Sequence, residues 1–338
     1  MKKILVVGYF GFENFGDEWL LVNLIKLIKK FSTTKKKIYV LYNIKKYRKI
    51  EDIYYIPRWN FFCIFNVLTK IDTVIYCGGL FQDHTSIFSF LYYLFIFLFA
   101  KLLFKKIVLL NTEFSLKKFP FFITKFLCLN SDMVILRNKL ETDRALKYYK
   151  NKNKILFCPD ICYIDFNEES MQVNDFKKDF KKIALIIKSE KKEMFLLVNF
   201  CIKLIEKYKC KLVFIPLHLR EDYRFCLEIA KQLKNCEIRV WDKLENYKFM
   251  LKDIDLVVAS RLHGIIMSSN LNIPFICFSE QTKIRNLVVS NYEAQCFLLN
   301  ELETQKLEEY IIYPKSNKNF FYKNIEMTFN NLTKLGYI

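Results

Sequence analysis

Short apolar runs alternate with longer segments of helical periodicity along most of the chain. In the first half, the runs at 3–7, 37–42, 73–77, 106–110 and 133–136 have the length and composition of buried strands. Strands that alternate with helices favour a parallel sheet joined by right-handed crossover helices. The pattern therefore predicts an α/β fold.

The alternation stops at a charged stretch and then begins again. Apolar runs lapse between Ile164 and Lys182, and strand-like runs resume at 183–187, 211–216 and 255–259. The 338 residues are also a natural length for two domains of average size. We therefore expect two Rossmann-like domains with parallel sheets and an active site in the cleft between them: an N-terminal domain over 1–165, a linker over 166–182 and a C-terminal domain over 183–338.

One segment, Ser86–Ala100, is nearly uncharged and rich in aromatic residues. Its 15 residues are fewer than the roughly 20 that a membrane-spanning helix needs. The alternation around the segment favours a buried crossover helix. The other interpretation is a helix in the membrane interface, where the lysines that follow it would meet anionic headgroups.

The charge balance favours anionic partners without naming one. The chain has 54 Lys and Arg against 35 Asp and Glu, which gives a formal net charge of +19. Because the lysines are scattered, a bias in composition explains the excess equally well, and we expect no nucleic-acid partner. The 11 cysteines form no C-x-x-C pair, which is typical of buried, reduced thiols and not of a metal site. The first residues resemble a strand more than a signal peptide, so we expect a cytoplasmic protein.

The stretch 256–283 carries the most informative pattern. An apolar run ends at Ser260-Arg261-Leu262-His263-Gly264, and a helix-like segment follows directly. This arrangement places a guanidinium and an imidazole at the carboxyl end of a parallel strand, beside the N–H groups of a helix start. Ligands bind at that edge of α/β sheets, and helix N-termini attract anions. The sequence therefore predicts an anionic substrate.

Polar side chains follow other predicted strands as well. In the first strand–helix turn, Asn14 and Asp17 suit sugar hydroxyls or the orientation of an attacking hydroxyl, although Asp17 could equally be a helix cap. Arg137 ends a strand, and Glu280 and Lys283 follow the last one. Because arginine can hold a carboxylate or phosphate through two donors, we expect Arg137 and Lys283 to add to anion binding, and we expect Glu280 to contact substrate beside them.

The turn after the run at 73–77 joins two glycines to a polar pair. Gly78 and Gly79 would admit a ligand against bare backbone. Gln82 and Asp83 offer hydrogen-bonding groups suited to a sugar, and Asp83 could serve as a general base. We therefore expect these four residues to contact substrate.

The chain resembles the polysaccharide pyruvyl transferase family, in particular the branch that modifies bacterial cell-wall polymers. The resemblance covers nearly the whole chain and is most specific in the segments GYFGFENFGDEWLL, YCGGLFQDHTS and ASRLHGIIMSSNLNIPFICFSEQTK. It implies a GT-B-like fold and transfer of a pyruvyl group from phosphoenolpyruvate to a sugar of a cell-surface glycan. The products would be a cyclic ketal and free phosphate.

The same resemblance implies roles for individual residues. His263 would be the acid that protonates the enol carbon, and Asp83 or Asp17 the base on the acceptor side. Arg261, with Arg137 and Lys283, would bind phosphoenolpyruvate as the donor substrate, and no separate cofactor is expected. The acceptor would be a sugar or a lipid-linked glycan, and a peripheral contact with the inner face of the membrane would fit it.

Two alternatives stay open. The first is a GT-B-type glycosyltransferase that uses a nucleotide sugar. The second is a non-catalytic protein that binds nucleic acid or a membrane surface through its net charge. The chain also departs from the family pattern, since 111–115 reads NTEFS where a glycine-rich turn is expected.

Overall fold

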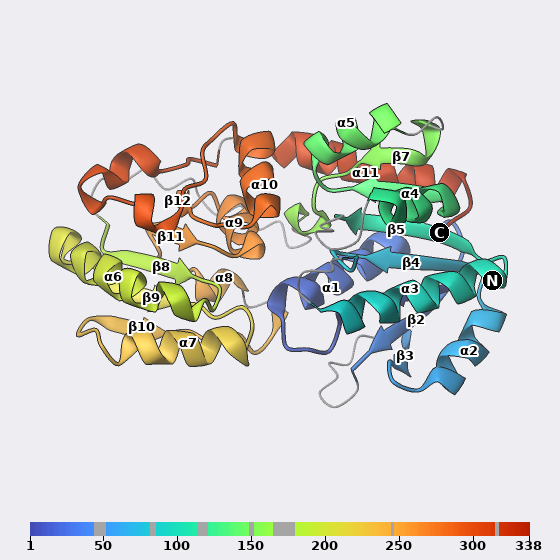
Figure 1. The fold of residues 1–338 in the computed structure, drawn as a ribbon, viewed down its shortest axis with the longest axis horizontal. Helices are drawn as coiled ribbons and strands as arrows, with labels where there is room; N and C mark the ends of the chain where they lie inside the picture. The colour runs from blue at the N-terminus through green and yellow to red at the C-terminus, as the bar shows by residue number, and fades with distance from the viewer. Residues whose placement is uncertain are drawn as a thin grey trace. The chain divides into compact units, whose positions relative to one another are not determined.

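The computed structural model describes residues 1–43, 52–81, 86–113, 121–148, 152–164, 180–244, 247–314 and 318–338. They form two compact units, each built around its own parallel sheet (Figure 1). Unit 1 comprises Met1–Phe12, Asp17–Ile161 and Phe320–Ile338, and unit 2 comprises Glu13–Gly16 and Cys162–Asn319.

Unit 1 contains a seven-stranded sheet in which every strand pairing is parallel. The strand order is β3-β2-β1-β4-β5-β6-β7, so it reverses between β1 and β4. The strands are β1 (Lys3–Val7), β2 (Lys37–Tyr42), β3 (Ile53–Pro57), β4 (Thr73–Cys77), β5 (Lys106–Thr112), β6 (Met133–Leu136) and β7 (Ile155–Phe157). The helices are α1 (Phe15–Phe31), α2 (Phe61–Lys70), α3 (Ile87–Leu102), α4 (Phe121–Asn130), α5 (Lys139–Tyr148) and α11 (Lys318–Lys334).

Unit 2 contains a five-stranded parallel sheet in the order β10-β9-β8-β11-β12, which reverses between β8 and β11. The strands are β8 (Lys182–Ile186), β9 (Lys211–Phe214), β10 (Cys236–Ile238), β11 (Leu256–Ala259) and β12 (Phe275–Cys277). The helices are α6 (Met194–Tyr208), α7 (Glu221–Ala230), α8 (Tyr247–Met250), α9 (Leu262–Asn270) and α10 (Thr282–Tyr292). In open parallel sheets, ligands bind beside the carboxyl ends of the strands at the point where the order reverses.

These sheets confirm the predicted α/β fold with two Rossmann-like units. The strands that formed clear apolar runs are also the buried ones, and all five residues of β4 are buried. β3 was not predicted, although its sequence IYYIP is apolar, and as an edge strand it is only partly buried. α2 was also missed, although the Asn60 side chain caps it by accepting a hydrogen bond from the Cys63 backbone N (3.0 Å).

The two units differ from the predicted domains mainly in two places, besides the start of unit 2 at Cys162. α11 belongs to unit 1, because Phe329 packs on Phe31 (ring centroids 6.0 Å apart) and the Thr333 hydroxyl donates to the Phe31 carbonyl (2.9 Å). The predicted C-terminal boundary at 338 is corrected accordingly. In the opposite sense, Glu13–Gly16 belongs to unit 2. Most of the predicted linker, 166–179, lies outside the described residues.

The aromatic segment forms α3, which connects the paired parallel strands β4 and β5 and begins at a cap where Ser86 accepts from the Ser89 backbone N (3.2 Å). One of its faces is in the hydrophobic core, where Phe90 and Phe97 are fully buried. α3 is therefore a crossover helix between two parallel strands, and this face of it is buried. None of the described helices combines the length and the apolar character needed to cross a membrane.

Candidate functional site

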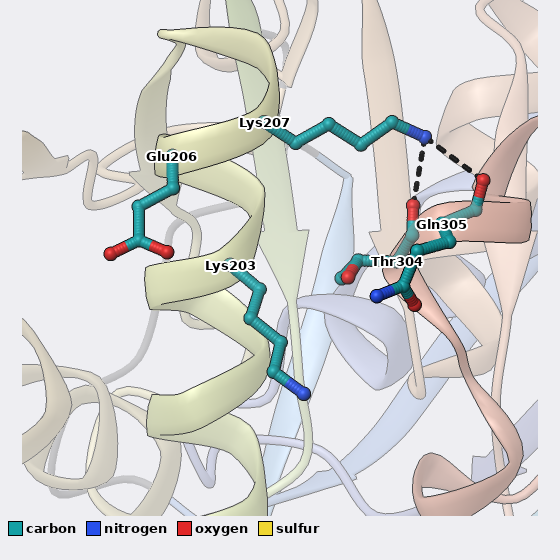
Figure 2. Close-up of a pocket in the computed structure, with 5 residues that line it drawn as sticks. All are labelled: Lys203, Glu206, Lys207, Thr304 and Gln305. Atoms are coloured by element: carbon teal, nitrogen blue, oxygen red, sulfur yellow. Dashed lines mark hydrogen bonds between the residues drawn. The ribbon is translucent and has the colours of Figure 1, made fainter.

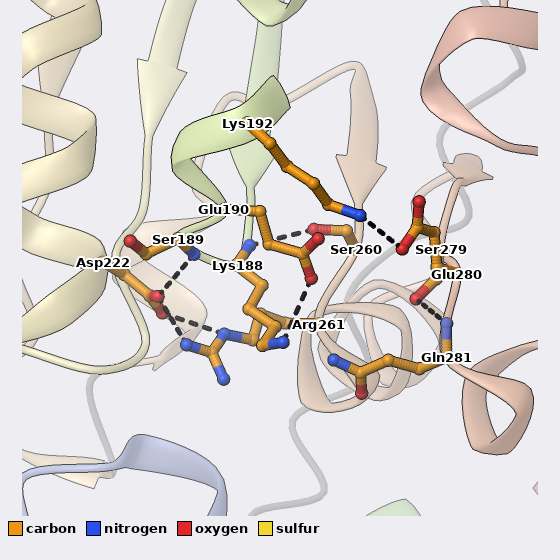
Figure 3. A network of polar contacts seen from close by, with 10 residues as sticks. All are labelled: Lys188, Ser189, Glu190, Lys192, Asp222, Ser260, Arg261, Ser279, Glu280 and Gln281. Atoms are coloured by element: carbon orange, nitrogen blue, oxygen red, sulfur yellow. Dashed lines mark hydrogen bonds and ion pairs between the residues drawn. The ribbon is translucent and has the colours of Figure 1, made fainter. Parts of the chain in front are cut away.

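Polar side chains gather at the carboxyl ends of four strands in unit 2 (Figure 3). They come from the segments that follow β8, β9, β11 and β12. Because β8 and β11 are the strands between which the order reverses, this is the edge where the topology itself places a ligand site. The group includes Lys188, Ser189, Glu190, Asp222, Ser260, Arg261, Ser279 and Glu280.

Asp222 holds the guanidinium of Arg261. Its two carboxylate oxygens accept from Nε (2.9 Å) and Nη2 of Arg261, and the Asp222 side chain is fully buried. The same carboxylate accepts from the backbone N of Ser189 (3.1 Å) and of His218 (3.0 Å). A two-pronged pair of this kind fixes the plane of the guanidinium. Arg261 thus has a set orientation, and Nη1 is the nitrogen that Asp222 does not engage.

Two lysines, each paired with a carboxylate, follow β8 at the same edge of the sheet as Arg261. Lys188 follows β8, its Nζ contacts the Glu190 carboxylate (3.0 Å), and its backbone N donates to the Ser260 hydroxyl (2.9 Å). Lys192 is paired with Glu280 at 2.7 Å. Each of these cations can exchange its carboxylate for a ligand anion, since the pairs are partly or largely exposed. Cationic donors in this number suit a small anion with several negative charges.

His263 lies in the first turn of α9, two residues after Arg261 at the N-cap. Its imidazole is packed against Gly16, because a Cβ placed on that glycine would lie 2.0 Å from Nδ1. Gly264 in the same turn also allows close packing, since a Cβ there would meet Ile186 of β8 at 2.7 Å. Gly16 thus lets the imidazole approach the backbone, and Gly264 lets the start of α9 pack closely on the Ile186 side chain.

The segment Glu13–Gly16 joins unit 2 through backbone pairing. Phe15 N donates to the Leu217 carbonyl (2.8 Å), and Asn14 forms a bridge with His218. The Asn14 side chain accepts from Gly16 N (3.2 Å), which holds the turn that presents Gly16 to the imidazole. Asn14 was predicted to contact substrate. In the structure it shapes this turn, and a substrate contact stays a prediction.

His218 is a second imidazole at the same edge. Burial lowers its pKa, and the Arg261 charge lowers it further against the opposing effect of Glu221 and Asp222. The ring is therefore neutral at pH 7. Its Nδ1 accepts from the Glu221 backbone N (3.3 Å), which leaves the proton on Nε2. His218 can therefore donate a hydrogen bond without adding charge.

In unit 1 the corresponding edge lies where β1 and β4 are neighbours. Gly78 follows β4 with φ +95°, and a Cβ there would lie 4.0 Å from Oδ1 of Asp17. Burial, together with the nearby carboxylates of Asp160 and Asp17, raises the pKa of Cys77. The structure thus brings Asp17, which the resemblance assigned to the acceptor side, close to Gly78, which was predicted to contact substrate.

The neighbouring Glu18 explains part of the GFENFGDE pattern. Its carboxylate is buried and accepts from Gly11 N (2.6 Å) and from the Tyr42 hydroxyl (2.9 Å). Gly11 has φ +83°, a conformation that favours glycine. Glu18 therefore holds the turn that precedes α1, and Asp17 is the acid of this pair with a half-buried side chain.

Arg137 is buried in unit 1 between two carboxylates. It contacts Glu113 (2.7 Å) and Asp160 (3.4 Å). Asn111, with φ +51°, donates to the Pro159 carbonyl (3.1 Å) and accepts from Ile161 N (2.9 Å). The NTEFS segment, where a glycine-rich turn was expected, thus supplies two residues with internal partners. The predicted contact of Arg137 with substrate stays a prediction.

The same cluster predicts a pH effect on stability. Burial, reinforced by Glu113, raises the pKa of Glu141 from 4.5 to about 8. The folded protein then binds this proton more tightly than the unfolded chain, so the stabilisation is complete below about pH 4.5 and is lost as the pH rises through about 8. Glu141→Gln should remove this loss and raise the free energy of unfolding by about 1–3 kcal/mol at pH 8, with little change at pH 4.5. Urea titrations at both pH values measure it, and an equal effect at both would contradict it.

Other predicted residues are placed less closely. Gln82 and Asp83 lie outside the described residues, and Gly79 is half-buried after β4. Lys283 is half-buried in the first turn of α10, three residues after the exposed Glu280. Sequence reasoning missed Asp222 because an acid in a first helical turn is ordinary. Lys188 could have been found, since it follows a predicted strand as Arg261 does.

A shallow pocket lies elsewhere in unit 2 (Figure 2). Lys203, Glu206 and Lys207 of α6 line it on one side, and Thr304 and Gln305 on the other. Lys207 donates to the carbonyls of Thr304 (2.8 Å) and Gln305 (3.2 Å). Lys203, Glu206 and Lys207 lie in the last turns of α6, which leads into the amino end of β9, so the pocket is at the opposite edge of the sheet from Arg261. It therefore does not belong to the site at the carboxyl ends.

A family model described as polysaccharide pyruvyl transferase matches residues 14–282. The match includes Asn14, Asp17, Arg261, His263 and Glu280. No curated protein matches the chain.

Solved structures share the fold at low sequence identity. MnaA of S. aureus, solved with UDP, is 14% identical with a TM-score of 0.65, and the match covers 100% of this chain and 98% of that one. The UDP-GlcNAc 2-epimerase of Neisseria meningitidis, bound to UDP-GlcNAc, is 13% identical with a TM-score of 0.62 over 99% and 98% of the chains. HepE of Anabaena, in complex with UDP and glucose, is 10% identical with a TM-score of 0.58 over 99% and 99%. At these identities the likeness establishes the fold, which is GT-B-like as predicted.

Proposed function

The chain belongs to the polysaccharide pyruvyl transferase family, and from this premise we propose that it transfers a pyruvyl group from phosphoenolpyruvate to a sugar of a cell-surface glycan. The observation that carries the proposal is the Arg261 guanidinium, held by Asp222 at the edge of unit 2 where the strand order reverses. The donor is a small molecule with a carboxylate and a phosphate, and it is a substrate, so no separate cofactor is needed.

Donor binding would use the cations around Arg261. The fixed guanidinium would bind one anionic group, and Lys188 would move from Glu190 to the other. The N–H groups in the first turn of α9 would add donors, since a helix start favours negative charge. His218, which is neutral, would hydrogen-bond a donor oxygen without competing for its charge. Lys283 is proposed as a further cationic contact.

The reaction requires one proton to be added to the donor and one to be removed from each of two acceptor hydroxyls. His263 would protonate the methylene carbon of the enol, and a sugar hydroxyl would attack the adjacent carbon. A second hydroxyl of the same sugar would then displace phosphate from that carbon. One of the two hydroxyl protons makes up for the proton that His263 gave to the methylene carbon, and the other leaves with the phosphate. The products are therefore a cyclic ketal and inorganic phosphate.

The acceptor side is proposed for unit 1. The resemblance assigns the role of base to Asp17 or Asp83, and of these two Asp17 is the one among the described residues. Bare backbone at Gly78 leaves room beside the Asp17 carboxylate. The acceptor would be a free or lipid-linked glycan whose sugar offers two neighbouring hydroxyls.

The test is phosphate release from phosphoenolpyruvate in the presence of candidate glycans. Arg261→Ala and His263→Ala should each lower the rate at least 100-fold, because each removes a group proposed to contact the reacting donor. Lys203→Ala, in the pocket at the opposite edge of the sheet, is the matched control and should leave the rate unchanged. Release that persists in both site variants would refute the assignment.

A nucleotide-sugar glycosyltransferase is the alternative function, since three solved structures with this fold contain UDP or a UDP-sugar. Thermal denaturation separates the two. Phosphoenolpyruvate should raise the melting temperature of the wild type and not of Arg261→Ala, whereas UDP- and GDP-sugars should have no effect. The opposite result would favour the alternative.

A further inference from the structure

α3 presents a continuous apolar stripe on the side that does not pack in the core. Phe88, Leu91, Phe95, Leu98 and Leu102 are exposed and recur at intervals of three or four residues, the spacing of one helix face. The opposite face of the same helix is buried in unit 1. A single exposed apolar residue needs no explanation, but a stripe of five marks an interaction surface.

α2 extends this stripe into a broader surface. Phe61 of α2 meets Phe95 edge-on at 5.8 Å, and Phe65 meets Phe99 of α3 at 6.0 Å. The two pairs advance together along both helices, so α2 and α3 run in the same direction side by side (Figure 1). Phe62 adds a ring that is 91% exposed. We call the outward side chains of α2, α3 and the turn after α3 the aromatic face.

The charges around the aromatic face are positive. α2 and α3 contain no acid, and Lys70 and Lys101 lie in their last turns. Lys105 joins them, since its Nζ donates to the carbonyl of Thr69 near the end of α2 (3.1 Å). Among the described residues from 53 to 113, the only exposed acid is Asp72, which accepts from the backbone N of Lys3 (2.8 Å).

We propose that the aromatic face docks unit 1 on an anionic lipid membrane, with α2 and α3 lying in the plane of the interface. Exposed aromatic rings enter the boundary between headgroups and acyl chains, and lysines at the rim attract anionic headgroups. A second copy of the chain fits less well, because pairing two such faces would bring the lysines of both copies together, and Asp72 is the one exposed acid among the described residues from 53 to 113. The proposal does not depend on the chemistry at Arg261.

Binding is tested by sedimentation of the full chain with vesicles of phosphatidylglycerol and phosphatidylcholine in equal amounts. The test variant is Phe62→Ser/Phe88→Ser/Phe104→Ser, whose wild-type side chains are 91%, 87% and 95% exposed, so folding should be preserved. We expect a loss of at least 10-fold in the partition coefficient. The matched control is Phe195→Ser/Phe249→Ser/Phe320→Ser, three exposed rings elsewhere, and it should bind as the wild type does.

A second measurement reports contact at one residue. Of the three tryptophans, Trp19 and Trp241 are buried and Trp59 is exposed beside Tyr92 (ring centroids 5.3 Å apart). Trp59 emission should shift to shorter wavelength with the anionic vesicles, and bromine-labelled acyl chains should quench it. Lys101→Glu/Lys105→Glu should weaken binding and reduce its dependence on salt.

Three outcomes would overturn the proposal. The first is no binding to anionic vesicles at physiological salt, and the second is equal binding by the serine variant of the aromatic face. The third is a dimer in solution that this serine variant abolishes, in the absence of vesicle binding. That result would assign the face to self-association.

Discussion

Replacing Asp222 with alanine will lower the free energy of unfolding by about 3–5 kcal/mol, the cost of leaving one partner of a buried ion pair alone. The carboxylate is fully buried and accepts from Arg261 and from the backbone N of Ser189 and His218. Alanine would leave all of these donors without the acceptor that replaces water for them. Urea denaturation followed by circular dichroism measures the change.

Two comparisons test whether the lost ion pair is the cause of the lower stability of Asp222→Ala. Glu303→Ala removes an exposed partner of Lys306 and should cost less than about 1 kcal/mol. The double variant Asp222→Leu/Arg261→Met should be more stable than Asp222→Leu alone, because it removes the stranded guanidinium together with the carboxylate. If Asp222→Ala costs no more than Glu303→Ala, Arg261 is not held by this carboxylate.

The same carboxylate connects stability to the proposed function. Asp222→Asn keeps the volume of the side chain but removes the charge and half of its acceptor capacity. The guanidinium should then lose its fixed plane. Phosphoenolpyruvate should bind the variant with an affinity at least 10-fold lower than that for the wild type. Asp222 is thus a positioning residue that acts through Arg261.

The sheets could be predicted because their strands are buried on both sides. A parallel strand such as β4 or β11 is a short, continuous apolar run. β3 is also a short apolar run (IYYIP) but was missed; it is an edge strand, and its residues are partly exposed. α11 packs on a unit formed mainly by the start of the chain, and no local pattern contains that information.

The position of Arg261 could also be predicted, because the carboxyl end of a parallel strand is fixed by the strand itself. Its partner could not. Asp222 is 39 residues away, and many acids in the sequence could have paired with Arg261 equally well. Arg137 shows the same limit, since the strand end was predicted correctly but the two carboxylates around it were not. Sequence pattern locates a strand end, and tertiary packing decides what its side chain contacts.

The contact between Gly16 and His263 gives the other large prediction, and it concerns activity. A Cβ on Gly16 would lie 2.0 Å from Nδ1 and 2.4 Å from Cε1 of the imidazole, so the ring must move if alanine is introduced. Displacement of a proposed acid by about 1 Å costs on the order of 100-fold in rate. We therefore expect Gly16→Ala to lower kcat at least 100-fold while His263 is still present.

The backbone of Gly16 can accept alanine without strain, since Gly16 lies in the first turn of α1 and does not have a positive φ. Alanine favours a helix by about 1 kcal/mol over glycine, which offsets part of the cost of moving the ring. In Gly16→Ala/His263→Ala the clash is absent, so this variant should be more stable than Gly16→Ala and no less active than His263→Ala. Phosphate release and thermal denaturation of the four proteins measure both effects. Full activity in Gly16→Ala would mean that the imidazole works from another position, because a ring in contact with Gly16 cannot remain there beside a methyl group.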